Sequence, residues 1–390
     1  MSRRRRSSRA PVPRLDVEDL LQDIFLRLPP QPSLLPRLSL VCKHWRSILS
    51  DPEFLDRFRR HHRNPPLLGF FAGGNYSRNH AFTPVLDQPD RIPAARFPLP
   101  WRHSPREEWN FVDCRHGLAV LINESRREIV VWDPLTDQQR GVAFPRGLDD
   151  DNNGKRYRHA AVLCADPEDG HVHGDCLSSP LKVALISVGR GHASACLYES
   201  ESRRWGDIVS TTTRDNICLV KPSILVGNTL CWLLGCVILE FDFEREAVRA
   251  IEAPAEVWIS YTDYWSLQLL RAEDGSLRLA VLSKQKLSIQ LWERKLSYDG
   301  VASWELLQKT IPLELLFPWR MCSGHERVLM VGCNEDTSVI VLSTMIGDFT
   351  VQIEPTQIRK ISKRNYMCRK IFYPYTNFYT ALLPILHKQQ

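Results

Sequence analysis

Two cysteines and two histidines lie within a stretch of thirteen residues, and both residue types can bind zinc. They are Cys164, His171, His173 and Cys176. Structural zinc sites use thiolate sulfur and imidazole nitrogen as ligands. The spacing matches no familiar zinc finger, however, and the intervening segment 166–170 has the acidic, proline and glycine residues of a surface loop. The sequence therefore favours a surface loop over a structural zinc, and we expect no metal and no other cofactor.

The residues needed for catalysis form no recognisable pattern in the sequence. No glycine-rich loop ends in the lysine and serine that hold nucleotide phosphates, and no Gly-x-Ser-x-Gly motif presents a nucleophile. Aspartates and glutamates gather at predicted turns, where solvated carboxylates are common. The sequence predicts no active site, and we expect a protein that is not an enzyme.

The positive charge of the chain is confined to its amino end. The chain of 390 residues has a formal net charge of +6, and six arginines lie between residues 3 and 14. Without them the chain has 45 basic and 45 acidic residues, so we expect no nucleic-acid-binding face. The tail, residues 1–14, is rich in Arg, Ser and Pro and is predicted to be disordered. It is either a nuclear import signal or simply solvated, and we expect a location in the cytoplasm, the nucleus or both.

Cysteine usage and hydropathy indicate a reduced compartment and no membrane span. Eleven cysteines are scattered without disulfide-like spacing, and the amino end lacks the apolar core of a secretory signal. The uncharged stretch 222–239 is interrupted by turn residues at 227–229 and again at Gly235. Three short strands explain this stretch better than one membrane helix.

Residues 15–60 read as three or four short helices. Asp16 is a good N-cap, Pro29–Pro30 ends the first helix, Ser33 can cap a second, and Asp51–Pro52 opens the last. Apolar residues fall on more than one face of these helices. A unit of this size seldom folds alone without a staple or a partner. We therefore expect the surplus apolar face to be a docking surface.

Several short groups of residues in this segment carry a family resemblance. They are Asp19-Leu20-Leu21, Ile24, Arg27-Leu28-Pro29, Ser33-Leu34, Val41-Cys42-Lys43, Trp45-Arg46 and Asp51-Pro52-Glu53-Phe54. With them the segment resembles an F-box, the helical module that joins an adaptor to the Skp-type linker protein of cullin-based ubiquitin ligases. The family usually opens with Leu-Pro, whereas this chain has Leu15–Asp16.

The resemblance implies a contact with the linker protein through apolar residues of the module. Several of these residues must also form the module's own core, and the sequence does not separate the two sets. The expected contact residues are Leu15, Leu20, Ile24, Leu28, Pro29, Leu34, Leu35, Val41, Cys42 and Trp45.

After a short linker at residues 63–66 the pattern changes to short β-rich runs separated by turn residues. Five predicted hairpins have outgoing strands near residues 129, 195, 237, 288 and 338. The later intervals, about 42, 51 and 50 residues, match the length of one four-stranded propeller blade. We predict a kelch-like β-propeller of roughly six to eight blades over residues 67–386, closed by pairing of segment 371–383 with segment 67–71. A β-sandwich is the main alternative.

Four short motifs follow one another in the second part of the chain: 113–118 (DCRHGL), 131–134 (VWDP), 226–232 (VGNTLCW) and 372–375 (FYPY). With these motifs the second part is similar to the F-box-associated β-propellers of plants, especially grasses. The expected fold is thus a small all-α F-box module at 15–62 followed by an all-β propeller. The two resemblances together imply a non-catalytic adaptor of a Skp–cullin–F-box ubiquitin ligase, whose propeller binds an unknown target protein. Two alternatives remain: a propeller scaffold or regulator that acts without a ligase, and a sugar-binding or enzymatic propeller.

Overall fold

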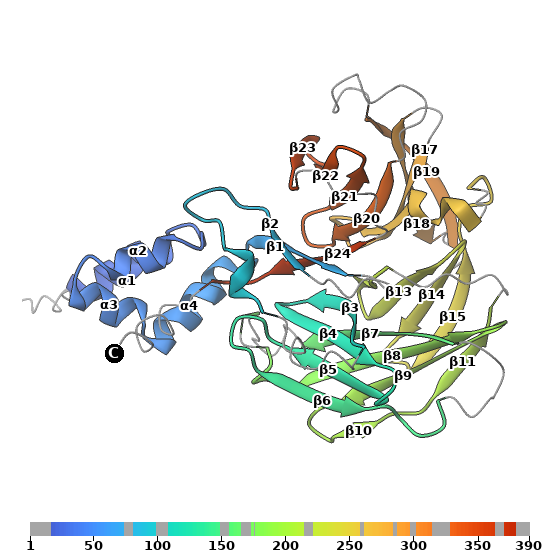
Figure 1. Ribbon diagram of the computed structural model, residues 1–390, viewed down its shortest axis with the longest axis horizontal. Coiled ribbons are helices and arrows are strands. Elements are labelled where there is room, and N and C mark those ends of the chain that lie inside the picture. The colour runs from blue at the N-terminus through green and yellow to red at the C-terminus, as the bar shows by residue number, and fades with distance from the viewer. Residues whose placement is uncertain are drawn as a thin grey trace, which may run out of the picture. The chain divides into compact units, whose positions relative to one another are not determined.

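A computed structural model shows two compact units, a small helical one and a large one made of strands (Figure 1). The structure describes residues 17–73, 81–98, 108–148, 156–164, 173–174, 176–213, 221–257, 261–283, 287–296, 302–313, 328–362 and 370–379. The helical unit comprises residues up to Pro65 together with those from Phe378 onward, and the strand unit runs from Pro66 to Asn377. Phe378, which the sequence-based boundaries place in the propeller, thus belongs to the helical unit.

The helical unit contains four short helices within residues 17–62. They are α1 (Val17–Leu26), α2 (Leu34–Ser39), α3 (Lys43–Leu49) and α4 (Pro52–His62). Helix α4 begins as predicted, because the Asp51 carboxylate accepts a hydrogen bond from the amide of Phe54 (3.3 Å) and Pro52 is its first residue. The predicted capping bond of Ser33 is absent, since this residue has helical φ and ψ values that direct its hydroxyl away from the free amides. The predicted cap at Asp16 lies outside the described residues.

Phenylalanines dominate the core of the helical unit. The ring of Phe25 packs edge-on against those of Trp45 and Phe54, with centroids 5.0 and 6.3 Å apart. Phe378 completes this core, since its ring lies 6.4 Å from that of Phe58 and is almost entirely buried. The buried set is Phe25, Leu35, Ile48, Leu49, Phe54, Phe58 and Phe378.

The strands of the larger unit form six antiparallel sheets in the described part of the chain, the blades of a six-bladed β-propeller. Blade 1 contains β24 (Ile371–Thr376), β1 (Leu67–Gly73) and β2 (Ala81–Pro84). Blade 2 contains β3 (Asn110–Arg115), β4 (Leu118–Asn123), β5 (Glu128–Trp132) and β6 (Gln139–Ala143). Blade 3 contains β7 (Tyr157–Cys164), β8 (Leu181–Gly189), β9 (His192–Glu199), β10 (Arg204–Trp205) and β11 (Val209–Thr212).

The remaining three blades have four strands each. Blade 4 contains β12 (Ile224–Val226), β13 (Thr229–Leu234), β14 (Val237–Asp242) and β15 (Ala247–Glu252). Blade 5 contains β16 (Leu267–Arg271), β17 (Leu277–Ser283), β18 (Ser288–Leu296) and β19 (Ala302–Pro312). Blade 6 contains β20 (Leu329–Asn334), β21 (Val339–Thr344), β22 (Gly347–Gln352) and β23 (Gln357–Lys360). The predicted hairpins are confirmed, and stretch 222–239 forms the three strands β12, β13 and β14. None of the described helices is long and apolar enough to span a membrane.

The ring closes through the last strand of the chain. Strand β24 pairs with β1, with Phe71 opposite Tyr373, and also lies against β20 of blade 6 and β3 of blade 2. Gly332 allows the approach of blade 6, because an added Cβ would overlap the carbonyl of Phe372. This closure confirms the predicted pairing with segment 67–71 for residues 371–376 of the predicted segment 371–383, whose residues 380–383 lie outside the described part of the chain. It removes most exposed sheet edges.

The first strands of the blades contact one another around the centre of the ring. Strand β3 lies against β7 and β24, β12 against β16, and β16 against β20. Apolar clusters fill the spaces between adjacent blades, for example between blades 2 and 3 and between blades 3 and 4.

Candidate functional site

Helix α1 carries two apolar side chains that the helical unit leaves outside its core. Leu20 and Ile24 are one turn apart on the same face, and they are 53% and 49% exposed. Phe25 is buried on another face of the same helix. Helix α1 is thus apolar on the inward face and partly apolar on the outward face, which is unusual for a helix that faces only water.

A second exposed apolar pair lies in the turn between α2 and α3. Leu40 and Val41 are 71% and 61% exposed. The turn forms because α2 ends at Ser39 and Cys42 has an extended backbone, with its sulfur accepting a hydrogen bond from the amide of Trp45 (3.4 Å). Val41 is among the contact residues predicted from the sequence, whereas Leu40 is not. Cysteine is not a usual N-cap, so the break before α3 had only a weak signal in the sequence.

The structure separates the predicted contact residues into exposed and core groups. Leu20, Ile24, Pro29, Val41 and Cys42 are exposed, whereas Leu28, Leu34 and Trp45 are half-buried. Leu35 is buried in the helical core, and Leu15 lies outside the described residues. The exposed residues are accessible to a partner, and their contact with a linker protein stays a prediction.

Covering these side chains would yield a moderate free energy. Complete burial of a valine, leucine or isoleucine side chain contributes about 1.5–3 kcal/mol, and these four residues are between 49% and 71% exposed. Together they would contribute roughly 4–7 kcal/mol, whereas a micromolar complex requires about 8 kcal/mol. The exposed apolar pairs can therefore anchor a partner but need further contacts around them.

A buried charged cluster joins three alternate blades at the centre of the propeller. Arg115, at the end of β3, places Nε 2.7 Å from one carboxylate oxygen of Glu335 and Nη2 3.3 Å from the other. The same Nη2 donates to the backbone oxygen of Ser223 (3.0 Å), and Nη1 lies 3.5 Å from the Asp113 carboxylate. Glu335 also accepts a hydrogen bond from the amide of Leu225 (2.9 Å). One guanidinium thus ties together blade 2, the start of blade 4 and the end of the first strand of blade 6.

The acidic groups of this cluster titrate differently. Burial raises the pKa of Asp113 to about 6, although the charge of Arg115 opposes this shift. Burial would also raise the pKa of Glu335, but the charge and hydrogen bonds of Arg115 and the amide of Leu225 bring it below its usual value. An enzymatic or sugar-binding propeller would need pKa-perturbed polar groups at its centre, and here they are present. The hydrogen bonds of Arg115 all end on other parts of the propeller, which favours a structural cross-link.

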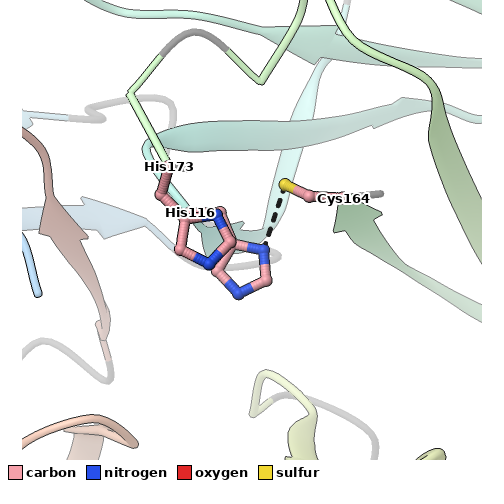
Figure 2. A group of neighbouring side chains, drawn as sticks. All are labelled: His116, Cys164 and His173. Carbon is pink, nitrogen blue, oxygen red and sulfur yellow. Dashed lines mark hydrogen bonds between the residues drawn. The ribbon is translucent and has the colours of Figure 1, made fainter. Parts of the chain in front are cut away.

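The fold brings together three of the four predicted zinc-type ligands and adds a histidine from another blade. The sulfur of Cys164 lies 3.1 Å from Nδ1 of His116, and the sulfur of Cys176 lies 3.6 Å from Nδ1 of His173. Figure 2 shows the ring of His173 stacked on that of His116 beside Cys164, with centroids 3.8 Å apart. A hydrogen bond from Cys176, together with burial, raises the pKa of the Cys164 thiol. His171 lies outside the described residues.

Comparison with known proteins identifies the helical unit. Residues 17–57 match the F-box domain family, within the segment predicted from the sequence. F-box only protein 10 of Arabidopsis thaliana is 26% identical over 290 residues, which cover 70% of this chain and 63% of that protein. A second F-box protein of Arabidopsis thaliana is 22% identical over 72% of this chain and 73% of its own length. The chain thus spans less than two thirds of the length of the first relative.

Solved structures show only a distant likeness to the chain. The WD40 domain of SCAP from fission yeast is 11% identical with a TM-score of 0.35, over 65% of this chain and 51% of that one. The propeller assignment rests on the six sheets of this chain. The fold defines a protein with a small helical module followed by a β-propeller. Residues 17–57 match an F-box domain, the propeller follows on its carboxyl side, and the chain is similar to F-box proteins of Arabidopsis thaliana.

Proposed function

We propose that this protein is a substrate adaptor of a Skp–cullin–F-box ubiquitin ligase. The observation that carries the proposal is the F-box match at residues 17–57 combined with apolar side chains left exposed on the same helices. F-box domains in general bind Skp-type linker proteins. Leu20, Ile24, Leu40 and Val41 are the exposed apolar groups that such a contact would cover.

The adaptor would act by position alone. The F-box joins the linker and, through it, the cullin, while the propeller holds a target protein near the ubiquitin-loaded enzyme. Tethering raises the local concentration of target lysines and removes part of the entropic barrier to transfer, so the chain itself needs no catalytic group. The internal pairing of the central charged cluster agrees with such a role.

The first test is the affinity of the purified full chain for a Skp-type linker protein. Ile24→Asp places a charge where the proposal expects an apolar contact, and burying an unpaired charge is costly. We expect the dissociation constant to rise by about 100-fold or more, equal to about 3 kcal/mol. Calorimetric titration measures this change.

A matched control comes from the propeller. Leu306 on β19 is 45% exposed, close to the exposure of Ile24, so Leu306→Asp introduces the same charge at an equally accessible site. This variant should bind the linker like the wild type. Equal affinities of wild type and Ile24→Asp, or no binding by the wild type, would exclude the proposed docking surface and favour a scaffold that works without a ligase.

A further inference from the structure

We propose that His116, Cys164, His173 and Cys176 form a structural zinc site at the rim of the propeller, where blade 2 meets blade 3. The proposal is independent of the adaptor function. Two thiols and two imidazoles form one of the common ligand sets of structural zinc, and soft thiolate ligands favour zinc over magnesium or calcium. In the described part of the chain, these residues include the one group of three or more potential metal ligands within reach of a single ion.

The fold explains why ligands so far apart in sequence lie together. His116 and Gly117 form the turn between β3 and β4, both with left-handed backbones (φ 54° and 77°). Cys164 is the last residue of β7, and β7 lies beside β3 in the ring. Strands β3 and β7 are the first strands of adjacent blades, so their ends reach the same rim. His173 and Cys176 then arrive from the connection between β7 and β8.

The distances fit a tetrahedral site. Zinc–nitrogen bonds of about 2.0–2.1 Å and zinc–sulfur bonds of about 2.3 Å place neighbouring ligand atoms roughly 3.3–3.8 Å apart. The ring nitrogen and sulfur of His116 and Cys164 are 3.1 Å apart, and those of His173 and Cys176 are 3.6 Å apart. The ligand atoms of His116, Cys164 and His173 all lie within 4.8 Å of one another. Three of the four ligands therefore lie within reach of one ion, and Cys176 lies beside one of them, His173.

One ring must turn for both histidines to bind the same ion. The planes of the His116 and His173 rings are only 12° from parallel, and Figure 2 shows the two rings overlapping. The lone pairs of stacked rings lie in separate planes and cannot meet at one point. Both histidines lie in turns outside the strands, and the terminal torsion of histidine is broad, so rotation of either ring can open the stack.

The ligand set defines the role of the ion. Four protein ligands leave no open position for water or substrate, so the zinc would be structural. It would fasten the β7–β8 connection to the β3–β4 hairpin and hold two blades together at their rim. The sequence alone did not indicate His116 as a ligand, because it is 48 residues away from Cys164 and belongs to another blade.

The test is zinc binding by the full chain, prepared metal-free with a reductant that does not bind metal. The wild type should bind one zinc ion per chain, measured by competition with a chromophoric chelator, and should melt at a higher temperature with zinc. Cobalt in place of zinc should give the absorption of sulfur-to-cobalt charge transfer. Cys164→Ser should weaken that absorption, because Cys176 is then the only thiolate of the proposed ligand set. It should also bind zinc about 100-fold more weakly or worse, because even substitution of residues that hydrogen-bond to metal ligands weakens binding about 10–100-fold.

Two further variants separate metal binding from folding. His116→Asn removes the imidazole but keeps the hairpin, because Asn–Gly is the preferred pair for a left-handed two-residue turn. This variant should fold like the wild type in chelator and yet bind zinc much more weakly. Cys236→Ser removes a half-buried thiol between β13 and β14 and should leave zinc affinity unchanged. The absence of zinc binding by the reduced wild type, or equal binding by wild type, Cys164→Ser and His116→Asn, would overturn the proposal.

Discussion

Within segment 113–118 neighbouring residues contribute to two different parts of the propeller. Asp113 and Arg115 point into the central charged cluster, whereas His116 and Gly117 form the hairpin turn at the rim. Gly117 cannot be replaced without strain, because its backbone is left-handed and an added Cβ would lie 2.5 Å from the amide nitrogen of the Asn377 side chain. One short motif thus supplies residues both to the central charged cluster and to the turn at the rim of the ring.

Asp113 should make the stability of the propeller depend on pH. Its pKa is raised from 3.8 to about 6, so between these values the folded chain holds a proton that the unfolded chain has lost. This group therefore lowers the free energy of unfolding as the pH rises from 4 to 6. The Asn side chain of Asp113→Asn does not titrate in this range. The free energy of unfolding of this variant, relative to that of the wild type, should therefore increase by about 3 kcal/mol between pH 4 and pH 7.

Urea denaturation of both proteins at a series of pH values measures this difference. The comparison removes the effect of His159, whose pKa is lowered to about 3 by burial and which is present in both proteins. Arg115, Glu335 and Ser223 face Asp113 in both proteins as well. Parallel pH profiles would contradict the assignment of a raised pKa to Asp113.

At the scale of elements, local patterns predicted most of the strands and helices. Strand β5 and its return strand β6 could be predicted because a short run of β-branched and aromatic residues at 129–132 leads into a turn-forming segment that begins at Asp133. Helix α4 was readable because Asp51–Pro52 is a strong start signal. The cap at Cys42 was missed because sulfur is a weak acceptor, and the cluster around Arg115 was missed because its partners are 108 and 220 residues away. Sequence periodicity carries no information about such contacts.

Phe378 should be needed for the stability of the helical unit. It follows the closing strand β24, and its ring fills the core beside Phe58. Phe378→Ala leaves a cavity in that core and should cost about 3–5 kcal/mol. Limited proteolysis within residues 17–62 should then become much faster, whereas Phe378→Leu should show a smaller change. Equal cleavage rates for wild type and Phe378→Ala would show that the helices are stable without this ring.

At the scale of the whole molecule, the chain combines a closed ring with a small module that is apolar on the outside. The propeller buries its own sheets between neighbouring blades and needs no partner to do so. The helical unit instead exposes two apolar pairs, one on α1 and one before α3. This contrast supports a division of labour in which the F-box joins the ligase and the propeller carries the target.

The adaptor role is tested most directly by the proteins that accompany the full chain in cells with the proteasome inhibited. The comparison is between wild type and Ile24→Asp, with Leu306→Asp as the control, and the measured quantities are cullin and ubiquitin-modified proteins. The wild type and Leu306→Asp should recover both. Ile24→Asp should still recover the proteins held by the propeller but without cullin and with little ubiquitin. Recovery of the same amount of cullin by wild type and Ile24→Asp, or no cullin with either, would contradict the account.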